Sequence, residues 1–232
     1  MALDARNILV GASPLYLSKK DSTDVSYAAV LPEGTNVTSG SSVLNDNKTD
    51  LRNSTLQGAY RNVGYTNNGL QVTYNPTYGS VTVDQLLDTA KLFKESMEVM
   101  IATELSEGTL ENVLAVFGQP SDGSATLSAS NTLTTYDAVN KKQELGLAAG
   151  ALGVQPTERQ LIAVGQAPTA AADGTNQKSE RVYYARRVLS VQQSQFSLAR
   201  NAATVFPVTF RLLPDANYAG AEYGKIIDRV LS

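Results

Sequence analysis

The segment from Val81 to Gly118 constrains the fold most, because a long alternating run leads directly into a short helix with marked ends. Within Glu107-Gly-Thr-Leu-Glu-Asn-Val-Leu-Ala-Val-Phe-Gly118, the apolar residues have the spacing of one helix face, at Leu110, Val113, Leu114 and Phe117. Ser106 or Thr109 supplies the N-cap hydroxyl, and Gly118 followed by Pro120 ends the helix. The sequence therefore predicts one helix over about 107–117, packed by one face.

The run before this helix fits two structures. From Phe93 to Leu105 the odd positions are mostly apolar and the even positions mostly polar, which is the pattern of a half-buried strand. A heptad-like spacing of good helix formers competes with it, over Leu86, Ala90, Phe93, Met97, Met100 and Glu104. A helix through Leu105 would merge with the next helix, and Val81-Thr-Val83 upstream is β-like. Periodicity alone leaves both alternatives open.

The composition limits the chemistry available to the chain. Its 232 residues, 42% of them hydrophobic, suit a single domain over 1–232 with a sizeable core. With no cysteine and no histidine, the chain has no thiol or Ser-His nucleophile and lacks the usual zinc ligands. A net charge of −3 argues against tight nucleic-acid binding. The first residues lack a signal-peptide pattern, so we expect a cytosolic origin.

The other segments indicate a β-rich chain. An apolar strand is expected over 7–17, and a hairpin with Leu70–Tyr74, a turn at Asn75–Gly79, and Val81–Val83. Further strands are expected over 158–164, 180–191 and 204–213, the last with Phe206, Val208, Phe210 and Leu212 on one face. Segments 18–62 and 119–155 have the composition of a long loop or arm and a long surface loop, and a short tail ends the chain. The predicted class is mainly β, an antiparallel sandwich or barrel with one flanking helix.

A search for catalytic motifs finds none. The chain has no phosphate-binding loop, dinucleotide fingerprint or nucleophile elbow. Asp84 with Asp88, or Glu95 with Glu98, are candidate carboxylate pairs for acid–base work, and exposed strand or helix charges explain them better. The basic residues Arg181, Arg186 and Arg187 suit a solvated or subunit-pairing face. We therefore expect no catalytic residues, no cofactor site and no metal site, and expect that the protein is not an enzyme.

Taken in order, these segments resemble the major tail tube proteins of long-tailed, siphovirus-like bacteriophages. The resemblance is carried by Arg6-Asn-Ile-Leu-Val-Gly-Ala12, by the hairpin leading into Val83-Asp-Gln85, and by the long run to Glu104 with the helix after it. It continues in Phe206-Pro-Val-Thr-Phe-Arg-Leu-Leu-Pro-Asp215 and Gly220-Ala-Glu-Tyr-Gly-Lys-Ile-Ile-Asp228. It covers most of the chain outside the two long loops, as an order of elements more than as invariant residues.

The resemblance implies a virion structural protein whose hexameric rings stack into the tail tube. Long hairpin strands from each subunit would join one β-barrel around a lumen, which makes 89–105 a strand. Glu98 and Glu104 are the lumen-facing candidates. The candidates for core packing or contact between subunits are Phe93, Met97, Val99, Ile101, Leu110 and Phe117.

The implied partners are further copies of the chain, the tape measure protein, the tail terminator and the distal tail proteins. DNA would pass through the lumen without specific binding, and no membrane anchor is expected. The implied location is the virion tail, assembled in the host bacterial cytoplasm. Two alternatives stay open: the inner-tube protein of a contractile tail or related injection system, and a carbohydrate-binding or adhesive β-sandwich.

Overall fold

The computed structural model describes several stretches of the chain. These are residues 13–18, 60–84, 88–120, 126–128, 132–149, 152–153, 156–167, 178–192, 194–198, 200–201 and 203–231. Most of the predicted arm over 18–62 lies outside them, as does the first part of the predicted strand over 7–17. The predicted surface loop over 119–155 is described in part.

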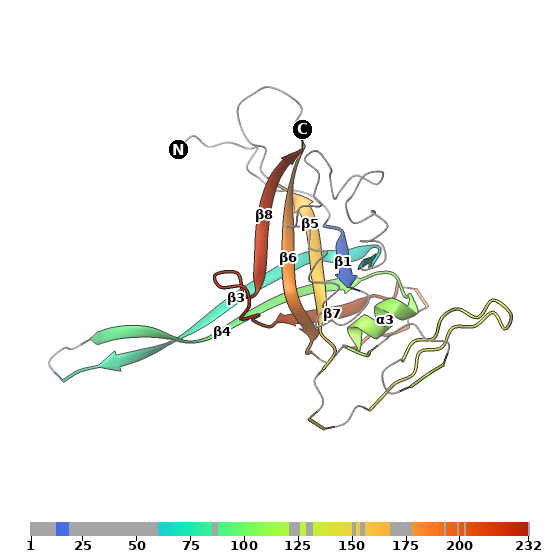
Figure 1. The fold of residues 1–232 in the computed structure, drawn as a ribbon, viewed down its shortest axis with the longest axis horizontal. Coiled ribbons are helices and arrows are strands. Elements are labelled where there is room, and N and C mark those ends of the chain that lie inside the picture. The colour runs from blue at the N-terminus through green and yellow to red at the C-terminus, as the bar shows by residue number, and fades with distance from the viewer. Residues whose placement is uncertain are drawn as a thin grey trace.

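Among the described residues the chain is mainly β with one short helix, as predicted (Figure 1). The strands are β1 (Leu15–Ser18), β2 (Tyr60–Asn62), β3 (Thr66–Thr82), β4 (Thr89–Leu105), β5 (Arg159–Gln166), β6 (Lys178–Ser190), β7 (Phe206–Leu212) and β8 (Gly224–Leu231), and the helix is α3 (Leu110–Val116). Strand β4 settles the ambiguous run in favour of a strand. Its ladders with β3 and β7 supply the tertiary pairing that overrides helix propensity.

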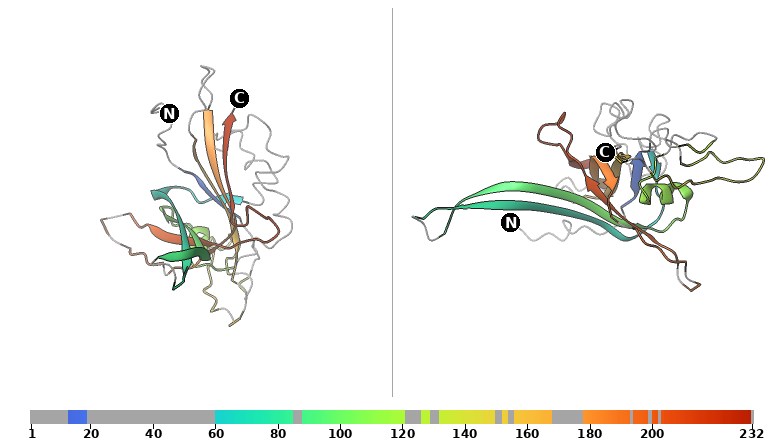
Figure 2. Two further views of the ribbon diagram at one scale, coloured as in Figure 1. Left: turned by 90° about the vertical axis from the view of Figure 1, so that its left-hand side faces the viewer. Right: turned by 90° about the horizontal axis from the view of Figure 1, so that it is seen from below.

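All strands belong to one antiparallel sheet that turns a corner at β6. The order is β2-β1-β5-β6-β7-β4-β3, and β8 also pairs with β6. The first part of β6, Lys178–Ala185, pairs with β8, whereas Val188–Ser190 pairs with β7. Strands β5, β6 and β8 therefore cross β3, β4 and β7 at a steep angle (Figures 1 and 2). As far as the structure describes the chain, the sheet stays open at both ends and is not closed into a barrel.

The main core fills the space between the two parts of this bent sheet. Its buried members come from the strands on both sides of the corner and from α3: Leu15, Leu17, Val63, Val99, Ile101, Leu105, Ala115, Val116, Leu161, Ala163, Ala185, Val188, Phe206, Val208, Phe210 and Leu212. The predicted alternation of β7 is confirmed, because its four apolar residues are all buried here. A smaller cluster on the other side of β5 and β6 includes Tyr60, Ile162 and Tyr184.

Helix α3 is shorter than predicted and packs by a different face. It begins after Thr109, whose hydroxyl accepts a hydrogen bond from the Asn112 backbone at 3.3 Å, and Gly118 follows its end with a φ of 63°. Asn112 is buried because its side-chain amide donates to the carbonyls of Val63 and Glu107, both at 2.8 Å. This rotates the predicted apolar stripe, so Leu110 is only half-buried and Phe117 is exposed.

Two other predictions were wrong. Residues 75–79 form no turn, because β3 continues through Asn75–Gly79 and pairs with β4 instead. Pro76 is tolerated there because β3 is the last strand of the sheet and one of its edges has no ladder to complete. The expected short tail is in fact strand β8, whose pairing with β6 is invisible to local periodicity.

Candidate functional site

The most unusual feature of the described chain is the β3–β4 hairpin, which projects far beyond the body (Figures 1 and 2). Each strand has 17 residues. Only Met100–Leu105 of β4 pairs with β7, so the distal part is a two-stranded ribbon. The side chains of β4 are exposed from Thr89 to Ser96 and alternate between buried and half-buried from Val99 onward. The hairpin is therefore anchored at its base, and no other described strand pairs with its distal part.

A β-bulge in β4 reverses which residues share a face. The pairing steps from Thr77 with Ser96 to Tyr78 with Lys94, so β4 contains one extra residue at this point. The Lys94 ammonium lies 2.8 Å from the Met97 sulfur and 5.7 Å from the centre of the Tyr74 ring, which places Lys94 on the face of Met97.

The bulge moves Phe93 to the opposite face. Its ring covers Gly79, its cross-strand partner, where an added Cβ would lie 2.6 Å from the ring. We expected Phe93 to share one face with Met97, Val99 and Ile101, and this was wrong because regular alternation stops at the bulge. Phe93 lies outside the core, whereas Val99 and Ile101 belong to it and Met97 packs against it.

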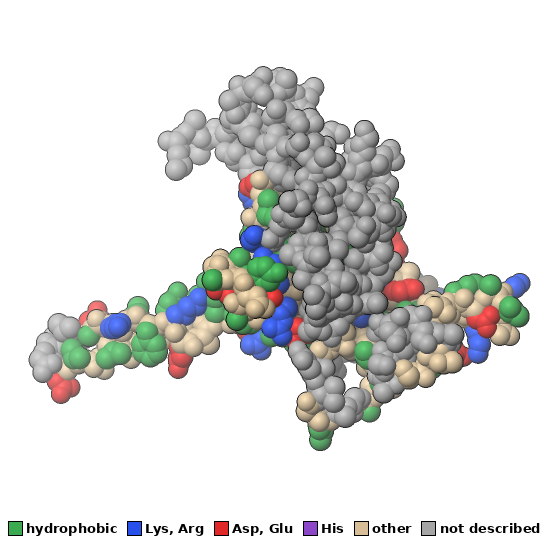
Figure 3. Space-filling view, viewed as in Figure 1, with side chains coloured by type: hydrophobic (Ala, Val, Ile, Leu, Met, Phe, Trp, Pro, Cys, Tyr) green, Lys and Arg blue, Asp and Glu red, His purple; other side chains and the backbone are tan. Residues whose placement is uncertain are grey.

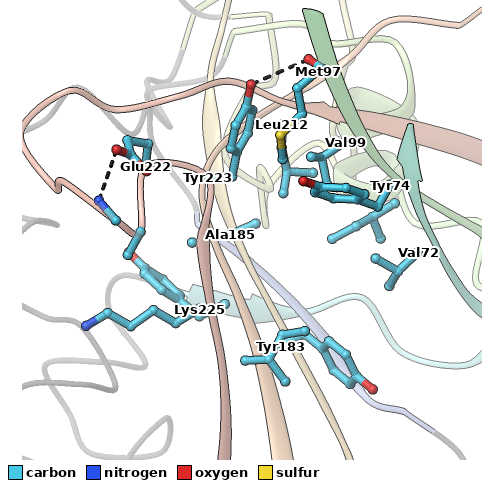
Figure 4. Close-up of a pocket in the computed structure, with 16 residues that line it drawn as sticks. Val72, Tyr74, Met97, Val99, Tyr183, Ala185, Leu212, Glu222, Tyr223 and Lys225 are labelled. Carbon is cyan, nitrogen blue, oxygen red and sulfur yellow. Dashed lines mark hydrogen bonds between the residues drawn. The ribbon is translucent and has the colours of Figure 1, made fainter. Parts of the chain in front are cut away.

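The hairpin face that carries Val99 and Ile101 borders an apolar groove of about 330 Å³ (Figure 4). On the other side of the groove lie Tyr183 of β6, the loop that ends in Tyr223, and Ile226 of β8. The Tyr223 hydroxyl donates a hydrogen bond to the Met97 carbonyl at 3.5 Å, which connects this loop to the hairpin. No sequence pattern predicted this groove, because the residues of its two walls lie more than eighty positions apart, as Ile101 and Tyr183 do.

The opposite face of the hairpin is polar. Glu98 lies 3.6 Å from the Arg211 guanidinium of β7, and Glu104 accepts a hydrogen bond from the Asn67 side chain at 3.0 Å. Both glutamates are half-buried and point away from the core, since Val99, Ile101 and Thr103 between and beside them are buried. The β3 residues that alternate onto this face are uncharged and polar: Gln71, Thr73, Asn75 and Thr77.

The distal ribbon exposes apolar side chains, some of which are visible in Figure 3. The strand register places them on both faces. Tyr78 and Leu92 lie on the groove side, with Leu92 65% exposed. Val81 and Phe93 lie on the polar side, and Phe93 is 46% exposed. A solitary two-stranded ribbon is only marginally stable in water, and exposed apolar side chains on it mark a contact surface.

The two helix residues that we singled out sit at the other end of the body. Leu110 is half-buried at the start of α3, and Phe117 follows its last turn. The Phe117 ring stacks on Phe196 at 6.3 Å, and Phe196 packs on Phe206 of β7 at 4.6 Å. The Phe117 ring thus connects the end of the helix to β7 through Phe196.

The ionised side chains are used to hold elements together. Arg187 donates two hydrogen bonds to the buried carboxylate of Glu158, at 2.6 and 2.7 Å, and Arg181 pairs with Asp228 in the same way. Arg186 is buried with its guanidinium 3.5 Å from the centre of the Tyr218 ring. We expected Arg181, Arg186 and Arg187 on a solvated or subunit-pairing face, but they make three separate contacts within the chain, and Arg186 is buried.

Arg61 is a buried base with a lowered pKa. Burial, and then repulsion from Arg159, lowers the pKa of Arg61 to about 10, while Glu111 acts in the other direction. Its guanidinium donates to the Asn112 side chain at 2.5 Å and to the Glu111 carbonyl at 2.7 Å. These bonds tie β2 to the helix, so the charge has a structural use.

In the part of the chain that the structure describes, no three His, Cys, Asp or Glu side chains cluster as metal ligands. No helix there has the length and apolar character needed to cross a membrane. No protein-family model matches the chain, and no curated protein is significantly similar to it. The functional argument therefore depends on the geometry of the hairpin and the groove.

Proposed function

We propose that this protein is a structural virion protein, the subunit of a phage tail tube, and that it has no enzymatic activity. The observation that supports this most is the β3–β4 hairpin, whose outer edges have no strand partner and whose apolar side chains are exposed among the described residues. Neighbouring molecules would pair with the edges of such a ribbon and cover its apolar side chains. Hexameric rings that stack into a tube provide those neighbours, in agreement with the family that the sequence resembles.

Closure into a ring removes the cost of the free edges. Within the described residues, β3 has a partner along one edge only, and β4 lacks a second partner from Thr89 to Val99. Exposed edges of this length promote uncontrolled association unless they are paired or blocked. In a barrel built from several subunits, every edge is paired and none remains exposed. In the tube, the strand edges that would cause uncontrolled association of the monomer form the contacts between subunits.

The two faces of the hairpin suit the inside and the outside of such a barrel. The polar face with Glu98, Glu104 and Arg211 would line the lumen, and the face with Val99 and Ile101 already packs on the body. A lumen of neutral polar side chains with a few charges of both signs offers DNA no continuous basic surface to bind. DNA and the tape measure protein would therefore pass without specific contacts.

Electron microscopy of the purified full-length chain in negative stain tests this proposal. We expect hollow rings or tubes with a central channel. A protein that stays monomeric at high concentration, under conditions that keep it folded, would contradict the tube. A contractile sheath around the native tail would assign the subunit to the inner tube of a contractile system instead.

A carbohydrate-binding module is the second candidate, because tyrosines from three elements, Tyr74, Tyr183 and Tyr223, line the groove (Figure 4). Aromatic side chains on a concave surface are suited to stack on sugar rings. This candidate predicts saturable binding of a glycan by the monomer, lost in a Tyr74→Ala variant. The tube predicts no glycan binding and an assembled protein.

A further inference from the structure

The two strands of the hairpin are covered unequally on the side of the apolar groove. Val99 and Ile101 of β4 are 8% and 3% exposed. Their cross-strand partners on β3, Tyr74 and Val72, line the same groove and are 59% and 47% exposed. Residues paired across a ladder lie on one face of the sheet, so the difference comes from what packs over each strand. The groove is therefore closed above β4 and open above β3.

The outer edge of β3 borders this open side. Among the described residues β3 is the last strand of the sheet, so no strand pairs with this edge. No residue from Thr66 to Thr82 is charged, although charged side chains commonly protect free edges. Pro76 removes one backbone donor, but the stretch Gln71–Asn75 beside the groove contains no proline. A strand added here would extend the sheet beneath the open side of the groove.

We propose that the groove is a docking site for the hairpin of a second copy of this chain. The distal part of β4 from the second copy pairs antiparallel with the outer edge of β3, and its Leu92 covers the groove. Leu92 is exposed and lies on the groove side of its own ribbon. Pairing in the same sense as the hairpin's own two strands keeps that side turned toward the groove. This inference deepens the proposed tube and rests on it for the supply of neighbouring copies.

Strand β7 limits the register of this contact. Met100–Leu105 of β4 already pair with β7, so an incoming β3 edge can pair only with Thr89–Val99. Strand β3 begins at Thr66, and the register nearest the body sets this residue opposite the last free residue of β4 in the second copy. Counting outward along both strands, past the bulges that each has in its own hairpin, sets Leu92 opposite Tyr74. The register that β7 allows therefore brings an exposed leucine to the open part of the groove.

One contact of this kind pairs two free edges, the outer edge of β3 in one copy and the distal edge of β4 in the next. A symmetric contact between two β3 edges would leave the distal edge of β4 and Leu92 uncovered, and it would end at a dimer. A heterologous contact repeats from copy to copy and generates a closed ring or an open filament, depending on the rotation between subunits. The unpaired edges of the hairpin therefore favour the heterologous contact.

Engineered disulfides test this contact, because the chain has no cysteine of its own. Tyr74→Cys is combined in the full-length protein with one cysteine at each position of 89–94 in turn. We expect covalent multimers on a non-reducing gel, strongest with Leu92→Cys and weak with Phe93→Cys, whose side chain lies on the other face. Within one molecule Leu92 pairs with Ser80, about 20 Å from Tyr74 along β3, so these two cysteines cannot form a disulfide inside one chain.

A second anchor position checks the register and guards against a folding defect in the first variant. With Val72→Cys in place of Tyr74→Cys, the strongest position should move from Leu92 to Lys94, because antiparallel strands run in opposite directions. A maximum that moves toward Thr89 instead would indicate parallel strands and would overturn the proposal.

Two controls exclude other contacts. Tyr74→Cys alone should give no covalent dimer, and a dimer would show that two β3 edges pair with each other, against the proposal. Tyr74→Cys with Val139→Cys should give no multimers, because Val139 is exposed on the 132–149 segment, on the other side of the body from the hairpin (Figure 1).

Equal, low yields at every position of 89–94 would also overturn the contact. Rings without covalent multimers would leave the tube intact and remove this contact. Covalent multimers with the expected maximum but without rings would support the contact and remove the tube.

Discussion

At the scale of single residues, the two Arg–carboxylate pairs make a natural comparison. Glu158 is 2% exposed and Arg187 30%, so Glu158→Gln leaves a half-buried guanidinium without its counter-charge. We expect this substitution to lower the unfolding free energy by about 2–3 kcal/mol. Breaking a fully buried ion pair costs more, and the effect is smaller here because solvent screens Arg187. Urea denaturation measures it. A loss under 0.5 kcal/mol, of the order seen for surface changes, would contradict a supporting role for the pair.

The control for this prediction is Asp228→Asn, which removes the partner of Arg181 at a site where Asp228 is 49% exposed. We expect Asp228→Asn to lower the unfolding free energy by at most about 1 kcal/mol. The hydrogen bond from Arg181 lowers the pKa of Asp228 below its ordinary 3.8. The small contribution of this pair is therefore present at neutral pH and is lost as the pH falls through the lowered pKa.

Alanine substitutions at two glycines distinguish the cost of backbone strain alone from the cost of strain combined with steric overlap. Gly224 has a φ of 140°, and a Cβ there would overlap the carbonyl oxygen of Tyr184 on β6. Gly220 has a φ of 79° and open space around it. We expect Gly224→Ala to cost more than about 3 kcal/mol and to disrupt the β6–β8 ladder, and Gly220→Ala to cost only about 1 kcal/mol. Amide hydrogen exchange of β8 tests this, and equal protection in both variants would contradict it.

At the scale of elements, the helix cap is the clearest case. Thr109 and Ser106 were equivalent candidates in the sequence, and the structure selects Thr109, whose hydroxyl accepts from the Asn112 backbone. We expect Thr109→Ala to cost about 1 kcal/mol and Ser106→Ala to have little effect. Thermal unfolding of both variants measures the difference. Equal shifts would mean that the hydroxyl does not stabilise the helix.

At the scale of the whole molecule, the tube predicts that stability and assembly respond to different residues of one strand. Leu92 is exposed on the distal ribbon and Ile101 is buried at its base. We expect Leu92→Ser to change the unfolding free energy by less than about 0.5 kcal/mol and yet to prevent assembly. Ile101→Val removes one methyl group from the core and should cost about 1 kcal/mol while rings still form. Denaturation and analytical ultracentrifugation check both, and full assembly of Leu92→Ser would contradict the proposed contact surface.

Local sequence patterns were enough to predict much of the secondary structure of this molecule. The strands β5, β6 and β7, the buried face of β7 and the stop at Gly118 all follow from spacing and residue type within a few positions. Of the candidate residues, Val99 and Ile101 were correctly expected to be able to pack in the core, since they alternate close to the base of β4. Phe93 was misplaced because no sequence pattern marks the bulge that moves it across the ribbon.

What the sequence determined by itself is the set of elements whose evidence is local, together with the absence of thiol and imidazole chemistry from a chain without Cys or His. Only the tertiary structure decided that 89–105 is a strand, that β3 runs straight through Pro76, that the Asn112 side chain is buried and that 224–231 forms a strand paired with β6. The physical reason is the same in each case. Backbone pairing and burial come from partners many residues away, and they outweigh propensities worth less than about 1 kcal/mol per residue.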